Sequence, residues 1–169
     1  MSKIKLKKLT QFYCDECGEI IEKPEDGFVE WEDELKEKIN KRFVRGFRIV
    51  HRKTKSPFRE NREGCFKYGN SKYRSDDELS NFIKYKLQRI YSLLDLGFMH
   101  DSEGDIGCRV ENMKEFVDFA KRLTIPHYEE ARKYFQAALD DGYFSDMNEI
   151  KLFSESSLKS IIEKYSTSE

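Results

Sequence analysis

Residues 12–31 read FYCDECGEIIEKPEDGFVEW, and this stretch decides the fold. It contains two cysteines, Cys14 and Cys17, which are separated by two residues and followed by Gly18. Two thiolates at this spacing can bind one metal ion through a tight turn, and the glycine permits the positive φ that turns backbone N–H groups toward the sulfurs. Aromatic residues precede the turn and Ile20 follows it, which suits a strand–turn–strand arrangement. We therefore expect a zinc knuckle here.

A CxxC pair also occurs in redox proteins, so this alternative has to be weighed. A thioredoxin-type site needs a βα arrangement with the first cysteine near a helix N-terminus. Residues 18–21 read as an extended segment instead, which favours zinc over a redox site. A structural zinc needs four ligands, and two of them must come from elsewhere in the chain.

The remaining candidates are the other cysteines and the histidines, namely His51, Cys65, His100, Cys108 and His127. His51 closes a basic strand-like segment and Cys65 lies in the loop after it, so both belong to the same β-type part as the knuckle. We predict a Cys3His set made of Cys14, Cys17, His51 and Cys65. His100 with Cys108 is the competing second pair, and His127 is expected to be a surface or helix-capping residue.

The hydrophobic pattern changes near residue 75. Before it, short apolar and aromatic stretches at 12–13, 27–31 and 43–50 are bounded by turn residues, which is typical of strands. In the last stretch the alternation places Phe43, Phe47, Ile49 and His51 on one face and Arg42, Arg48 and Arg52 on the other, although Arg45 interrupts it. The charged segment 32–41 is expected to be a short helix or a long hairpin loop.

After residue 75 the apolar residues follow a helical period. Ser75–Glu78 resembles a capping box that would begin the first helix, which would run through Leu94 and end at Gly97. Further stripes predict helices over 113–123, from Pro126 to Gly142, and over 158–165. The sequence therefore predicts an α+β protein, with a zinc-binding β-rich unit at 1–74 and a helical unit of three to four helices at 75–169, either separate or on one shared core.

The charge distribution is uneven although the total is close to zero. The 169 residues hold 31 Lys+Arg and 32 Asp+Glu, for a formal net charge of -1. By segment the charge is +4 for 1–14, -9 for 15–37, +11 for 38–74 and -7 for 75–169. Either the acidic and basic segments pair with each other in the fold, or the basic segment recruits a partner.

Several classes are excluded or disfavoured by composition and by absent motifs. Aromatic residues make up 14% and Gly and Pro number only 9 and 3, so the chain is not expected to be disordered. The sequence lacks an apolar run of about 18 residues and an apolar segment after its basic start, so we expect neither a membrane span nor a secretory signal, and the cysteines indicate a cytoplasmic protein. HExxH, GxGxxG, P-loop and GxSxG patterns are all missing, so we predict no enzymatic activity, with a zinc hydrolase as the weakest alternative.

Binding is therefore the expected function, and two classes of partner compete. We predict a non-enzymatic zinc-stabilised adaptor or regulator that binds a protein partner through the basic side chains of Arg42, Arg48, Arg52, Lys53, Lys55 and Arg59. The alternative is a nucleic-acid-binding zinc protein, because cations and aromatic rings alternate along 41–74 and would suit phosphates and bases. The acidic helical unit and the sequence pI of about 6.4 count against this alternative.

The stretch at 12–31, followed by GFRIVHRK at 46–53 and by Cys65, resembles small zinc-knuckle proteins of bacteria and their phages. The resemblance covers roughly the first 70 residues, and it implies a metal site and a bacterial or phage setting but no reaction. The knuckle is also similar to zinc ribbons in general. A ribbon usually supplies a second CxxC, which the separated His51 and Cys65 would replace here.

Overall fold

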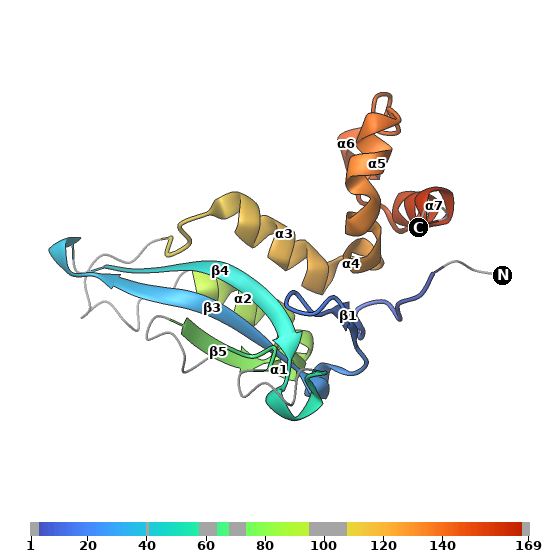
Figure 1. Ribbon diagram of the computed structural model, residues 1–169. Coiled ribbons are helices and arrows are strands. Elements are labelled where there is room, and N and C mark those ends of the chain that lie inside the picture. The colour runs from blue at the N-terminus through green and yellow to red at the C-terminus, as the bar shows by residue number, and fades with distance from the viewer. Residues whose placement is uncertain (1–3, 40, 58–63, 68–73, 95–107, 167–169) are drawn as a thin grey trace.

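The computed structural model describes residues 4–39, 41–57, 64–67, 74–94 and 108–166. It confirms the predicted α+β class, with strands in the N-terminal part and helices in the C-terminal part (Figure 1). A two-stranded sheet and a three-stranded sheet are formed by the described residues. None of the helices in these segments is long and apolar enough to cross a membrane.

The small sheet is the knuckle. Its strands β1 (Phe12–Tyr13) and β2 (Ile20–Ile21) are antiparallel, with Phe12 opposite Ile21. Both of these side chains are fully buried. The turn between the strands is thus held to the core at its base while its tip carries the two cysteines.

The large sheet has the strand order β4-β3-β5, and all its pairs are antiparallel. Its strands are β3 (Gly27–Lys36), β4 (Lys41–His51) and β5 (Arg74–Glu78), with short 3-10 turns η1 (Pro24–Asp26) and η2 (Glu37–Ile39) before and after β3 and η3 (Lys53–Lys55) after β4. The expectation of a helix or long loop at 32–41 is wrong, because β3 continues to Lys36. Carboxylates of this segment pair across the hairpin with Arg42 and Arg45, so the charged residues stabilise the strands.

The predicted buried face of β4 is wrong at Phe43, because a β-bulge interrupts the strand. Glu30 lies opposite Arg48 and Glu32 lies opposite Arg45, so two residues of β4 oppose Trp31 alone. Gly46 adopts φ +65° inside the bulge, where a glycine is favoured. The extra residue shifts the alternation of buried and exposed side chains by one. Val44 is therefore fully buried, where the sequence predicted Phe43. Phe43 is half-buried, and the ammonium group of Lys36 lies over its ring.

The predicted capping box at 75–78 is also wrong. These residues form β5 and lie in register with β3, with Ser75 opposite Trp31 and Asp76 opposite Glu30. The first helix, α1 (Leu79–Lys84), begins only afterwards, and α2 (Lys86–Leu94) follows a break at Tyr85. Gly97 and the segment 101–107 lie outside the described residues.

The remaining helices are short except for two. They are α3 (Met113–Thr124), α4 (Tyr128–Ala131), the 3-10 turn η5 (Arg132–Tyr134), α5 (Phe135–Asp140), α6 (Glu149–Leu152) and α7 (Glu155–Tyr165). The side chains of Asn112 and Ser154 cap α3 and α7 by accepting a backbone N–H, as N-cap residues do. Where a single helix was expected from Pro126 to Gly142, the structure has three shorter elements, α4, η5 and α5.

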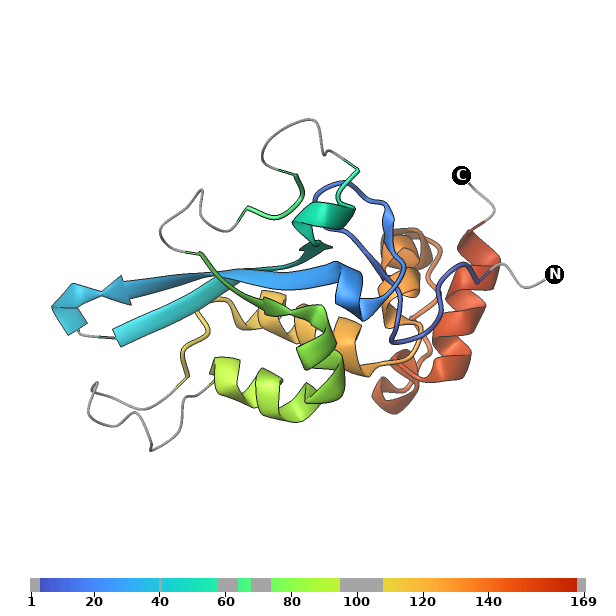
Figure 2. The same cartoon turned by 90° about the horizontal axis from the view of Figure 1, so that it is seen from below.

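Two groups of buried apolar side chains hold these elements. In the first, residues of both sheets pack with α1, α2 and α3, so this core draws on residues from both sides of position 74. Figure 2 shows α1 and α2 along one side of the large sheet. The second group lies within α4–α7 and includes the fully buried Leu158, Ile161 and Ile162.

Candidate metal centre

Four side chains from three parts of the chain meet beside the end of the large sheet. Cys14 and Cys17 come from the turn of the knuckle, His51 is the last residue of β4, and Cys65 belongs to the described segment 64–67. One ligand atom from each of them lies within 4.8 Å of all the others. Cys14, His51 and Cys65 are buried and Cys17 is half-buried, so the cluster can hold one metal ion away from bulk water.

The backbone of the knuckle turn fixes the first two sulfurs. The N–H of Gly18 donates to the carbonyl of Cys14 at 2.9 Å, and the N–H of Cys14 donates to the carbonyl of Glu19 at 2.9 Å. Gly18 has φ +77°, and a Cβ built there would meet no atom within 4 Å. The glycine is therefore required for its backbone conformation and not for space.

His51 is oriented by its second ring nitrogen. Its Nε2 lies 3.3 Å from the carbonyl oxygen of Ile20, which can only accept, so Nε2 carries the proton and donates. Its Nδ1 lies 3.4 Å from Sγ of Cys17 and 4.0 Å from Sγ of Cys65. The lone pair of Nδ1 thus faces the sulfurs, in the arrangement by which a backbone carbonyl typically sets a metal-binding histidine.

Cys65 is held by a buried serine. The N–H of Cys65 donates to Oγ of Ser56 at 3.1 Å, and Oγ of Ser56 lies 3.2 Å from Sγ of Cys65. Ser56 is 1% exposed. This hydroxyl can donate to a thiolate at Cys65 and so supports a sulfur that binds metal.

Without a cation, the environment of the cluster disfavours the thiolate form of the cysteines, which is the form that binds metal. Burial raises the pKa of the Cys17 thiol to about 12, and the neighbouring Cys14 adds to the rise. Burial also raises the pKa of Cys65. A bound metal cation would reverse this by stabilising the thiolates, so metal binding would release protons here.

The competing candidates lie elsewhere or outside the described residues. Cys108 is exposed, and its Sγ donates to the carbonyl of Val110 at 3.8 Å. His127 has φ +65°, and its Nε2 lies 3.4 Å from a carboxylate oxygen of Glu155 on α7. His100, the other half of the competing pair, lies outside the described residues.

The basic side chains proposed for partner binding are largely engaged with carboxylates of the same chain. Arg42 pairs with Asp33, Arg48 with Glu16 and Glu30, Arg52 with Glu78, and Lys55 with Asp26. Lys53 is exposed, and Arg59 lies outside the described residues. Much of the charge of the basic segment is thus offset by acidic residues inside the fold.

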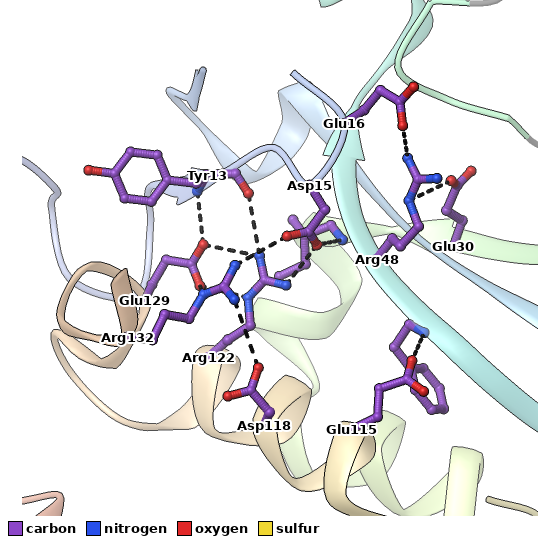
Figure 3. Close-up of polar contacts among 12 residues, drawn as sticks. Tyr13, Asp15, Glu16, Glu30, Arg48, Glu115, Asp118, Arg122, Glu129 and Arg132 are labelled. Carbon is purple, nitrogen blue, oxygen red and sulfur yellow. Dashed lines mark hydrogen bonds and ion pairs between the residues drawn. The ribbon is translucent and has the colours of Figure 1, made fainter. Parts of the chain in front are cut away.

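Sequence reasoning missed a buried ion-pair network next to the metal centre. Arg122 of α3 is 4% exposed and binds both Glu129 of α4 and Asp15, the residue after the first cysteine (Figure 3). A signal was present in the sequence, because the helical period places Arg122 beside Phe119 and Leu123 on the apolar face of its helix. A charge at such a position requires a buried partner.

Comparison of the chain with protein-family models, with curated proteins and with solved structures gives no match. The chemistry of the four clustered side chains and the contacts around them therefore carry the functional argument.

Proposed function

We propose that Cys14, Cys17, His51 and Cys65 bind one Zn²⁺ ion in a closed structural site. The observation that carries this proposal is the meeting of three sulfurs and one imidazole nitrogen within 4.8 Å. Sulfur-rich tetrahedral sites suit zinc, and four protein ligands leave no open position for water or substrate. The ion stabilises the junction between the knuckle, β4 and the segment that bears Cys65.

Metal analysis of the purified chain tests this site. We expect about one zinc per chain in the wild type and close to none in Cys14→Ser. Cys108→Ser is the matched control, because it removes an exposed cysteine outside the cluster, and it should keep its zinc. A zinc-free wild type, or equal loss in both variants, would contradict the proposed site.

We further propose that the protein is a non-catalytic adaptor or regulator that binds another protein. The closed ligand set supports a structural role for the metal over a catalytic one. Leu87 and Tyr91, one turn apart on α2, are 56% and 60% exposed. Large exposed apolar and aromatic side chains are typical of surfaces that bind proteins.

Nucleic-acid binding through 41–74 is the second candidate, and binding to heparin and to generic duplex DNA separates the two. Because the basic side chains of 41–74 are offset by carboxylates, we expect that the protein is not retained on heparin or on duplex DNA at low salt. Retention with a steep salt dependence would contradict the adaptor proposal and favour nucleic acid. If retention occurs, Lys53→Glu should weaken it and Lys159→Glu, a charge reversal on α7, should not.

A further inference from the structure

The turn that supplies two of the metal ligands is also bound by the helical part of the chain. Asp15 lies between the two cysteines, and its Oδ2 accepts from Nη1 of Arg122 at 2.7 Å. Its Oδ1 accepts from Nη2 of Arg132 in η5 at 3.2 Å. The same carboxylate accepts from the backbone N–H of Ile49 at 2.7 Å, so Asp15 joins the turn, β4 and the helices (Figure 3).

The backbone next to the first cysteine is fixed by the same helices. The N–H of Tyr13 donates to Oε1 of Glu129 at 3.0 Å, and its carbonyl accepts from Nη2 of Arg122 at 3.3 Å. Arg122 and Glu129 are joined by two further bonds of 2.6 and 3.0 Å. Both polar groups of the Tyr13 backbone are thus satisfied by side chains of α3 and α4.

The other acidic residue of the turn points elsewhere. Glu16 pairs with Arg48 of β4 at 2.7 Å and with Lys67 at 2.8 Å. Figure 3 shows Glu16 directed toward Arg48 while Asp15 faces the arginines of the helices. Two adjacent carboxylates between the cysteines therefore bind different parts of the fold.

We propose that Asp15 couples metal binding to the docking of the helices, so that each stabilises the other. This inference rests on the proposed metal site. The metal fixes the turn in the conformation that presents Asp15 and the Tyr13 backbone to Arg122, Arg132 and Glu129. When the metal leaves, the turn loses this constraint, and α3, α4 and η5 lose the polar contacts that join them to it. Because coupling between two binding events is reciprocal, weakening the helix contact also weakens metal binding.

Hydrogen exchange followed by mass spectrometry tests the first half of the coupling. Removal of zinc from the wild type by a chelator should accelerate exchange in 113–140 as well as in the knuckle. Asp15→Asn should show faster exchange in 113–140 with zinc bound and little further change on chelation. Glu16→Gln, the matched control in the same turn, should keep the response of the wild type.

Zinc affinity measured by competition with a chelator tests the reverse direction. Arg132→Gln touches none of the four ligands, and we expect its zinc affinity to fall by about fivefold or more. Lys159→Gln removes a cation of α7 that pairs with Glu155 on its own helix, and it should leave the affinity unchanged.

The outcomes separate the two proposals. A wild type that binds no zinc contradicts the proposed metal site itself. The metal site stands and the coupling is overturned under a different result. In that case the wild type binds zinc, but hydrogen exchange in 113–140 does not change on chelation and Arg132→Gln has the zinc affinity of the wild type.

Discussion

At the scale of single residues, Ser56 supports the candidate metal centre without being one of its proposed ligands. Its buried hydroxyl lies 3.2 Å from Sγ of Cys65 and accepts from the N–H of the same residue. Loss of such a supporting contact typically lowers metal affinity by about 10- to 100-fold, so we expect Ser56→Ala to lose about tenfold in competition with a chelator. Ser92→Ala removes a hydroxyl that binds the carbonyl of Arg89 in α2 and should have no effect on affinity.

A second prediction concerns Asp76 and the dependence of folding stability on pH. Burial, with Asp77 and Glu30 nearby, raises the pKa of Asp76 above its ordinary value of 3.8. The folded chain therefore holds this proton to higher pH than the unfolded chain, and stability falls as pH rises through the window above 3.8. Asp76→Asn should accordingly unfold at higher denaturant concentration than the wild type at pH 7, with no advantage below that window.

Asp141 provides a contrast of opposite sign. Its hydrogen bonds with Lys164 and Tyr165 lower its pKa, so the ionised form favours the folded state. Asp141→Asn should be less stable than the wild type at pH 7, and the difference should vanish as the carboxyl is protonated. A gain in stability in Asp141→Asn would contradict the assignment for Asp141, and a loss in Asp76→Asn at pH 7 would contradict the assignment for Asp76.

The residues of the candidate metal centre could be predicted because their chemistry is local. The CxxCG pattern indicates a metal turn by its spacing, and His51 and Cys65 follow from their place in the β-type part. The contacts that support them could not be predicted in the same way. Asp15 and Arg122 are 107 positions apart, and Ser56 is a serine in a loop without any distinguishing pattern.

At the scale of elements, the bulge in β4 gives a prediction about Gly46. Its φ of +65° disfavours residues with a Cβ, while a Cβ there would meet Glu32 only at 3.5 Å, an ordinary contact. The cost of substitution is therefore conformational. We expect Gly46→Val to lose about 2 kcal/mol of unfolding free energy and Gly46→Asn less, because asparagine tolerates this region better. Equal losses in urea denaturation would show that space, not φ, sets the cost.

The elements that were predicted wrongly share one physical cause. Hydrophobic period and capping patterns are local, whereas β3, β4 and β5 are stabilised by partners across the sheet. The carboxylates at 32–34 belong to a segment that was predicted as a short helix or a long hairpin loop, but they pair with arginines of β4. Ser75–Glu78 has the residues of a capping box, yet its backbone groups pair with β3. Neither partner is visible within the segment itself.

At the scale of the whole molecule, the uneven charge distribution becomes a set of internal contacts. The acidic segment 15–37 and the basic segment 38–74 face each other across β3 and β4 and around the knuckle, and several of their ion pairs connect the two. The acidic helical part adds Glu111, which pairs with both Lys36 and Arg45. Many positive charges of the basic segment are thus neutralised by nearby carboxylates of the same chain. For this reason the basic segment does not by itself indicate a polyanionic partner.

A buried ion pair within the helical part, between Arg122 and Glu129, gives the last prediction. Arg122 and Glu129 are 4% and 5% exposed, so removal of either leaves a buried charge without its main partner. We expect Arg122→Met alone and Glu129→Gln alone to lose about 3–5 kcal/mol of unfolding free energy each in urea denaturation with zinc saturating.

The double variant should lose much less than the sum of the single losses, because no uncompensated charge remains between the two positions. Asp15 keeps Arg132 in all three variants, so at least one contact between the knuckle and the helices remains in each of them. Additive losses would instead mean that Arg122 and Glu129 stabilise the fold through separate contacts. Arg122 would then act through Asp15 and the Tyr13 carbonyl, and Glu129 through the Tyr13 N–H, each independently of the other.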